Sequence, residues 1–209
     1  GNSFFERMEV KDMMAYFKLV VNPNDDESFK RVVNKPARSI GDTSVSALNE
    51  CARAHGCSLF KAAYMSDTEV YGLKSAALVR LRTFCDMIDS LAVSVSRTDA
   101  YELAKRIADV SGLYNFYKQD NSIEGLARTA NVEELVSSVQ AFVEERQDEA
   151  EELGEGAVFT LDDFLENVSL LSNVDVNDDE DTNNKVSLMT VHSAKGLEYP
   201  YVFVAGMEE

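Results

Sequence analysis

The sequence predicts a mainly α-helical protein that ends in two buried strands. Apolar residues recur every three or four positions through most of residues 6–171, which is the period of amphipathic helices. Residues 186–191 and 201–205 are instead unbroken apolar runs, as expected for strands buried on both faces of a sheet. Two adjacent strands do not make a stable sheet alone. We therefore expect them to belong to a larger sheet, and the chain to be a fragment of a longer protein.

About nine helices are predicted, separated by capping residues or by Gly and Pro. The clearest of them span residues 6–21, 28–33, 43–55, 58–65, 74–95, 98–110, 131–142 and 160–171. Residues 113–117 are rich in aromatic side chains, and residues 118–125 are predicted to be a loop.

The first helices have clear boundaries. Val10, Met13 and Phe17 lie on one face of the first helix, which should stop at the turn-forming residues 22–24. Asp25 and Asp26 then suit the start of the second helix, because short polar side chains cap free backbone N–H groups. Lys35 and Pro36 end it.

The later helices are marked by their length and by their caps. Residues 74–95 carry the longest apolar stripe. Asn131 followed by Glu134, and Thr160 followed by Asp163, have the spacing of capping boxes that open two helices. Residues 173–184 are charged and lack apolar support, which predicts a loop.

Charge is distributed unevenly along the chain. The net charge is −17, but residues 1–143 hold 19 acidic and 17 basic side chains, whereas residues 144–209 hold 18 acidic and 3 basic ones. Most of the acidity therefore lies in two runs, 144–155 and 175–181, which are typical of solvated surfaces. The first 143 residues are nearly neutral, so a nucleic-acid partner is not excluded.

Composition excludes several classes of protein. Cys51, Cys57 and Cys85 fit no zinc spacing and are accompanied by only two histidines, His55 and His192, which predicts reduced structural thiols and no metal site. No apolar run is long enough to span a bilayer, and the N-terminal residues do not look like a signal peptide. We expect a cytoplasmic protein.

The polar segment between the two predicted strands is a candidate ligand site. Residues 192–198 combine a histidine, a hydroxyl, a lysine, a glycine and a carboxylate directly after a strand. Loops at the carboxyl ends of buried strands are where α/β proteins bind ligands.

Three blocks of sequence resemble one family. Residues 188–203, LMTVHSAKGLEYPYVF, resemble motif V of superfamily 1 DNA helicases of the UvrD, PcrA and Rep group. Residues 4–12, FFERMEVKD, and residues 31–41, RVVNKPARSIG, are similar to two further blocks of that family, in the same order. Residues 44–185 match only in length and helical character.

The resemblance implies a division into subdomains. Residues 1–35 and 186–209 would be two parts of the RecA-like α/β motor subdomain called 2A, with motif V in the second part. Residues 36–185 would be the helical 2B subdomain that this family inserts into 2A. The fold implied is mainly α, with a partial α/β piece.

The resemblance also implies roles for individual residues. Glu198 and Gly196 correspond to nucleotide-binding positions of motif V, and Thr190, His192 and Lys195 lie where the family contacts single-stranded DNA. Residues Arg38, Ser39, Ile40 and Gly41 resemble the Gly-Ile-Gly turn by which 2B meets the duplex backbone. Ser39 departs from that pattern, because the family has Gly there. For most of these residues a structural role in a turn or an ion pair is the alternative.

The activity implied is ATP-driven 3′ to 5′ unwinding of DNA, with ATP and Mg²⁺ as cofactors and single- and double-stranded DNA as partners. The sequence has no G-x-x-x-x-G-K-[ST] phosphate loop, so this chain alone is expected to be inactive, with no catalytic residue and no cofactor of its own. Exposed 2A surfaces are expected to favour self-association. The alternative function is a non-enzymatic acidic helical module that binds other proteins.

Overall fold

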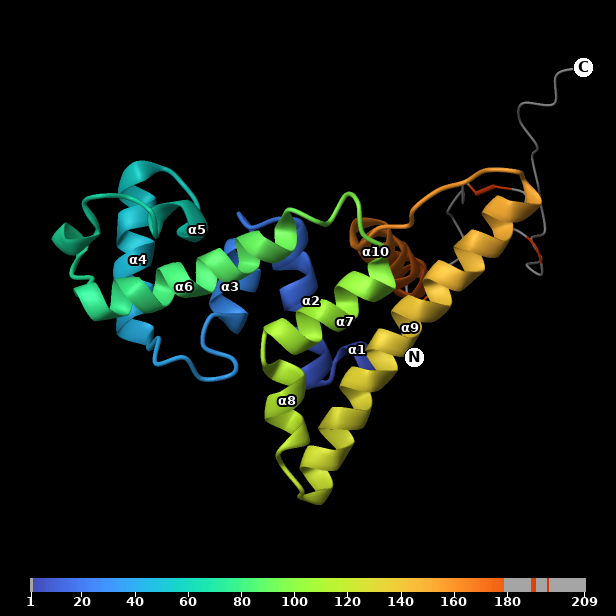
Figure 1. Ribbon diagram of the computed structural model, residues 1–209, viewed down its shortest axis with the longest axis horizontal. Coiled ribbons are helices and arrows are strands. Elements are labelled where there is room, and N and C mark those ends of the chain that lie inside the picture. Colours follow the sequence, from blue (N-terminus) through green and yellow to red (C-terminus); the bar gives the residue numbers. More distant parts are fainter. Residues whose placement is uncertain (1, 179–188, 191–194, 196–209) are drawn as a thin grey trace, which may run out of the picture. The chain divides into compact units, whose positions relative to one another are not determined.

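The computed structural model describes residues 2–178, 189–190 and 195, and the chain divides into two compact units, residues 1–172 and 173–209. The first unit is built of helices (Figure 1). In the second unit the structure describes three pieces of the chain. Residues 173–178 are the end of a helix, Met189 and Thr190 lie in neither helix nor strand, and Lys195 lies in a turn.

The helices are short at the start of the chain and longer towards its end. In chain order they are α1 Asn2–Phe5, α2 Met8–Val21, α3 Asp26–Val32, α4 Asp42–His55, α5 Leu59–Ala62, the 3₁₀ helix η1 Thr68–Tyr71, α6 Ser75–Ala92, α7 Ala100–Val110, α8 Leu113–Lys118, α9 Ile123–Glu152 and α10 Leu161–Asp178.

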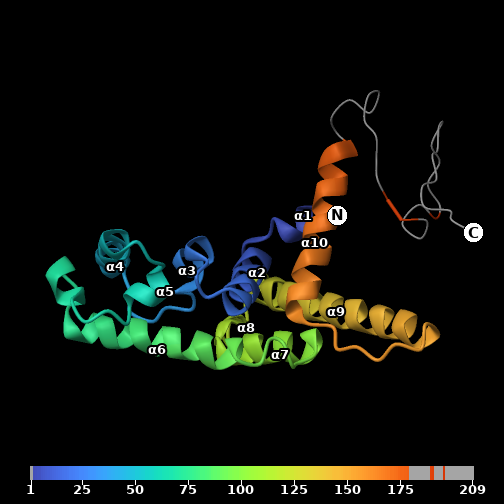
Figure 2. The same ribbon diagram turned by 90° about the horizontal axis from the view of Figure 1, so that it is seen from above.

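Helix α2 is the centre of the first unit. It contacts α1, α3, α6, α7 and α9, and Figures 1 and 2 show it between the α4–α5 region and the α7–α9 region. Among its buried side chains, Met13, Tyr16 and Phe17 are fully inaccessible to solvent. Each such side chain stabilises the fold by about 1.5–3 kcal/mol through removal from water. The fold therefore depends on a helix that is enclosed on most of its faces.

Two groups of helices pack around α2. On one side α4 contacts α5 and η1, and α5 contacts α3; on the other side α7, α8 and α9 contact one another. Helix α6 contacts α2 and α7, and its Arg82 donates to the carbonyl oxygens of Ala63 and Met65 just after α5, so it connects the two groups. Phe29 of α3 and Phe84 of α6 meet edge to face, with ring centroids 5.3 Å apart.

The mainly α prediction is confirmed, and most predicted helices lie close to where the apolar period puts them. The predicted caps also form: the Asp25 carboxylate accepts from the Ser28 N–H at 3.1 Å. Thr160 and Asp163 make a reciprocal capping box, in which the Thr160 N–H donates to the Asp163 carboxylate at 2.9 Å and the Asp163 N–H donates to the Thr160 hydroxyl at 3.4 Å.

The prediction that Asn131 caps a new helix is wrong. Helix α9 runs without a break through Asn131, and its true N-cap is Ser122, whose hydroxyl accepts from the Gly125 N–H at 3.0 Å. The Asn131 side chain instead accepts from Arg7 at 2.6 Å and donates to Glu9 at 2.5 Å. A tertiary contact therefore accounts for the polar residue that looked like a cap. The loop predicted at residues 118–125 also ends earlier, because α9 begins at Ile123.

The end of the chain differs from the predictions in one further place. Residues 173–178, predicted to be loop, are helical, because α10 extends to Asp178. The two predicted C-terminal strands lie outside the described residues, apart from Met189 and Thr190 of the first, and no strand occurs in the described part of the chain.

The proposed boundary between residues 35 and 36 crosses a continuous hydrophobic core. Val10 and Phe17 of α2, and Phe29 of α3, belong to the same buried cluster as Leu81 of α6 and Ile107 of α7. Within the described residues, no helix has both the length and the apolar character needed to cross a membrane.

Candidate nucleic-acid interface

The segment between α3 and α4 forms a tight turn that the side chain of Asn34 holds closed. Its amide oxygen accepts from the Arg38 N–H at 2.7 Å and from the Ile40 N–H at 3.1 Å. The Lys35–Pro36 peptide bond in this turn is cis. Ile40, 1% exposed, anchors the turn in the core.

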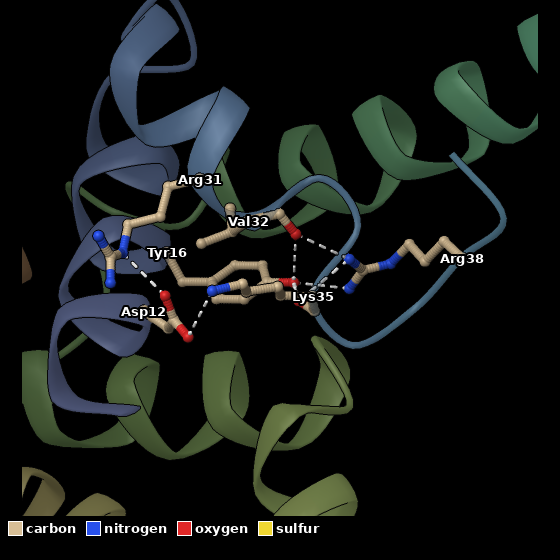
Figure 3. Close-up of polar contacts among 6 residues, drawn as sticks. All are labelled: Asp12, Tyr16, Arg31, Val32, Lys35 and Arg38. Carbon is tan, nitrogen blue, oxygen red and sulfur yellow. Dashed lines mark hydrogen bonds and ion pairs between the residues drawn. The ribbon is translucent and has the colours of Figure 1, made fainter. Parts of the chain in front are cut away.

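Arg38 fixes this turn to three helices. Its Nη1 donates to the carbonyl oxygens of Val32, Val33 and Lys35 at 3.0–3.2 Å. Its Nη2 donates to the Tyr16 hydroxyl at 2.7 Å and to the Ser111 carbonyl, at the end of α7, at 2.8 Å. The last carbonyls of a helix have no partner within the helix, so Arg38 supplies donors to the end of α3. Both terminal nitrogens of its guanidinium are therefore used inside the protein (Figure 3).

Aromatic rings complete the surroundings of Arg38. Its guanidinium carbon lies 5.0 Å from the centre of the Phe84 ring and 5.8 Å from that of Tyr16, which are cation–π distances. The Tyr16 hydroxyl also bonds to the carbonyl oxygens of Val32 and Lys35. Burial raises the pKa of Tyr16 from 10.0 to about 12, although neighbouring Arg38 opposes the rise.

Asp12 is shared by the other two cations near the turn. Its side chain is 1% exposed, and it accepts from Arg31 Nε at 2.8 Å and from Lys35 Nζ at 3.5 Å (Figure 3). The three cations that make this stretch basic in sequence thus all have partners within the fold. Arg31 and Lys35 form ion pairs with Asp12, whereas Arg38 donates to neutral carbonyl and hydroxyl groups. Asp12 and Tyr16 were not predicted as part of this site. The signal in the sequence was a carboxylate within the apolar pattern of residues 6–21.

Ser39 and Gly41 present the backbone of the turn to solvent. Both residues are exposed, and Ser39 has φ +57°, a left-handed conformation that Gly adopts without strain. This backbone conformation favours Gly, which is also the residue that the resemblance to the helicase turn implies here.

Gly41 is the N-cap residue of α4, with φ −81°, and a Cβ built on it would meet no atom within 4 Å. Neither backbone strain nor lack of space within the described residues requires Gly at this position.

The N-terminal turn of α4 has no side-chain cap. Gly41 has no side-chain oxygen to accept from the first N–H groups of the helix, and no other side chain in the described part of the chain takes that role. Such N–H groups, together with the helix dipole, favour an anion. Asp42 and Thr43 there are exposed, and the Asp42 carboxylate opposes the attraction. The arrangement can bind a phosphate through the backbone without recognising bases.

The motif V residues are described only in part. Thr190 and Lys195 are exposed. His192, Gly196 and Glu198 lie outside the described residues, so their predicted roles remain predictions.

Comparison with known proteins gives consistent matches over the whole chain. The family model described as the UvrD-like helicase C-terminal domain matches residues 1–209. The chain is 32% identical over 209 residues to the ATP-dependent DNA helicase PcrA of Staphylococcus aureus (strain NCTC 8325 / PS 47). It is 35% identical over 213 residues to PcrA of Bacillus subtilis (strain 168), and 36% identical over 212 residues to DNA helicase II of Escherichia coli (strain K12). Each match covers 100% of this chain but only 27–28% of the relative.

Proposed function

This chain belongs to the UvrD-like helicase C-terminal domain family, and from that premise we propose that it is part of an ATP-dependent DNA helicase. Support comes from the relatives, which are named as DNA helicases, two of them as ATP-dependent. The chain spans about a quarter of their length, so the motor activity belongs to the longer protein. In that protein, ATP with Mg²⁺ would drive 3′ to 5′ movement along single-stranded DNA.

Residues 1–35 and 186–209 are proposed to belong to the 2A motor subdomain, and residues 36–185 to the helical 2B subdomain. The shared core of α2, α3, α6 and α7 means that the first 2A segment and the 2B helices fold as one body. A movement of 2B relative to the remainder of the motor would then carry α2 and α3 with it.

The helical unit is proposed to contact the backbone of duplex DNA through the turn at residues 38–41 and the N-terminal turn of α4. The observation that carries this proposal is Gly41, whose missing side chain leaves the uncapped end of α4 open to an outside group. Ser39 adds an exposed hydroxyl. Arg38 takes part by holding the turn in shape, because its terminal nitrogens already bond to carbonyls and to Tyr16.

Duplex binding by this chain is proposed to be weak. Arg31 and Lys35 share the carboxylate of Asp12, so these cations would have to leave a partner within the fold before they could contact a phosphate directly. Most of the attraction would come from oriented N–H groups.

A Gly41→Ser substitution tests this proposal. Ser is a good N-cap, and the space around Gly41 is open, so the variant should fold with unchanged or slightly higher stability. Its hydroxyl would accept hydrogen bonds from the N–H groups that would otherwise bind phosphate. We expect duplex affinity, measured by fluorescence anisotropy at low salt, to fall about fivefold, equivalent to about 1 kcal/mol.

Gly156→Ser is the matched control, because Gly156 is also exposed and a Cβ there would meet nothing within 4 Å. It should bind duplex as the unsubstituted chain does. Equal duplex affinity of Gly41→Ser and Gly156→Ser would show that the turn does not contact the duplex. If the unsubstituted chain does not bind duplex DNA at low salt, the proposed duplex contact is wrong.

Motif V is proposed to couple nucleotide to single-stranded DNA in the longer protein, with Gly196 and Glu198 towards the nucleotide and Thr190, His192 and Lys195 towards DNA. Because the sequence has no phosphate loop, the 209-residue chain should release no phosphate from ATP, even with single-stranded DNA present. Turnover that disappears in Glu198→Ala would contradict this expectation. Self-association of the chain remains a prediction.

A further inference from the structure

Helix α4 and the segment before η1 bring together three side chains that are typical metal ligands. Cys51 and His55 are four residues apart on α4 and so share a face of the helix. Asp67 directly precedes η1. One ligand atom of each residue lies within 4.8 Å of those of the other two, and His55 Nε2 is 2.9 and 2.8 Å from the two carboxylate oxygens of Asp67.

The cluster is closed on one side and open on the other. Cys51 is 0% exposed, whereas the side chains of His55 and Asp67 are 32% and 39% exposed. Burial, followed by the charge of Asp67, raises the pKa of the Cys51 thiol. The ring of Tyr71 meets His55 edge to face at a centroid distance of 6.3 Å. The thiol itself is therefore not exposed to solvent, and an ion would reach it as the partly exposed side chains of His55 and Asp67 move apart.

We propose that Cys51, His55 and Asp67 together bind a zinc ion. Thiolate, imidazole and carboxylate are the ligand types that Zn²⁺ takes in proteins, at about 2.3, 2.0–2.1 and 2.0–2.2 Å. These bond lengths put the nitrogen and oxygen ligands of a tetrahedral site about 3.3 Å apart. The His55–Asp67 pair at 2.8 Å is therefore about half an ångström too close, a change that the exposed Asp67 side chain can make.

Binding follows a simple proton balance. The ion replaces the thiol proton of Cys51 and any proton shared between His55 and Asp67, and these protons go to solvent. The fourth coordination position is filled by water. The consequence for the fold is a link between η1 and the C-terminal half of α4.

This group was not predicted from the sequence, because the three cysteines do not fit a zinc spacing. The overlooked signal is Cys51-x-x-x-His55 on a predicted helix, which supplies two ligands from one face. The third ligand comes from a carboxylate twelve residues beyond the histidine, and only the packing of η1 on α4 brings it there.

Co²⁺ is a suitable probe, because thiolate ligation gives it a charge-transfer absorption band that is absent from hexa-aqua cobalt. We expect the metal-free 209-residue chain to develop this band at one equivalent of Co²⁺, and Zn²⁺ to abolish it. We also expect Zn²⁺ to raise the Tm, because a ligand that binds the folded state stabilises it. Absence of the band with folded protein would overturn the proposal.

Variants separate the proposed site from its neighbours. His55→Ala and Asp67→Asn change exposed side chains, so they should leave the fold intact and weaken Co²⁺ binding at least tenfold. Cys51→Ser should remove the band. Glu69→Gln, an exposed carboxylate of η1, and Cys85→Ala, a buried thiol of α6, are the controls and should bind as the unsubstituted chain does. A band that survives His55→Ala, or that is lost with Cys57→Ser but not with Cys51→Ser, would contradict the assignment.

Discussion

At the scale of residues, Arg38 has a larger structural role than its sequence context indicates. A basic residue in a polar turn suggests a phosphate contact, yet its two terminal nitrogens serve four carbonyls and one hydroxyl. Its planar fork reaches the end of α3 and the end of α7 at the same time, which a lysine amine cannot do. Arg38 therefore acts by shaping the turn.

Arg38→Ala should lower the free energy of unfolding by about 3 kcal/mol, because it leaves the Val33 and Ser111 carbonyls without this donor and removes three further hydrogen bonds. Arg38→Lys should lower the free energy of unfolding by more than half of that amount, because lysine keeps the positive charge but lacks the planar guanidinium. Urea unfolding measures both, with the exposed Arg53→Ala as a control of little effect. If Arg38→Lys is as stable as the unsubstituted chain, the positive charge alone is enough to stabilise the turn.

Tyr117, like Tyr16, should titrate in a way that is visible in the free energy of unfolding. Burial, with the charges of Asp12 and Glu9, raises its pKa from 10.0 to about 12. A group with a raised folded-state pKa contributes stability that is complete below the unfolded pKa and is lost as pH rises through the folded pKa. The chain should thus lose stability between pH 10 and pH 12.

Tyr117→Phe should make that loss smaller by on the order of 1–2 kcal/mol. Unfolding measured from about pH 8 to about pH 12 tests this, with the lower pH as the internal baseline, because the phenol is then neutral in both states. Identical pH profiles for the two proteins would contradict the assignment.

At the scale of elements, α9 shows where local signals compete with tertiary contacts. Ser122 and Asn131 are both suitable cap residues, but only Ser122 directly precedes the first residue of the helix, Ile123. Asn131 lies in mid-helix and bonds to Arg7 and Glu9 near the start of α2. Pairing across 122 residues leaves no local pattern in the sequence, so the residue that resembled a cap is a link between two helices.

Asn131→Asp separates the two interpretations. Asp is as good an N-cap as Asn, but here it would face the carboxylate of Glu9, which is 6% exposed, and would give it no donor. We expect Asn131→Asp to destabilise the fold by about 2 kcal/mol and more than Asn131→Ala does. Ser122→Asp, at the true cap, should be nearly neutral in thermal unfolding. The opposite order of stability for the two Asp variants would restore Asn131 as a cap.

At the scale of the whole molecule, the helical class, most helix positions and the family followed from the sequence, because apolar period, caps and motif residues are local. The burial of Asp12 and the joining of α2 to later helices did not, because they depend on contacts between distant segments. The same is true of the Cys51, His55 and Asp67 cluster. For the turn after α3, the family resemblance implied a contact with the duplex backbone, which stays a prediction, and it gave no sign of the hydrogen bonds that Arg38 makes within the fold.

We propose that this chain meets duplex DNA through the backbone at the start of α4. Amide hydrogen exchange of the 209-residue chain, with and without duplex DNA at low salt, is the measurement that tests this contact. We expect added DNA to slow exchange at Ser39 and at residues 41–44, with no change along α9. Protection along α9, or unchanged exchange at residues 39–44 under conditions in which the duplex is bound, would contradict the claim.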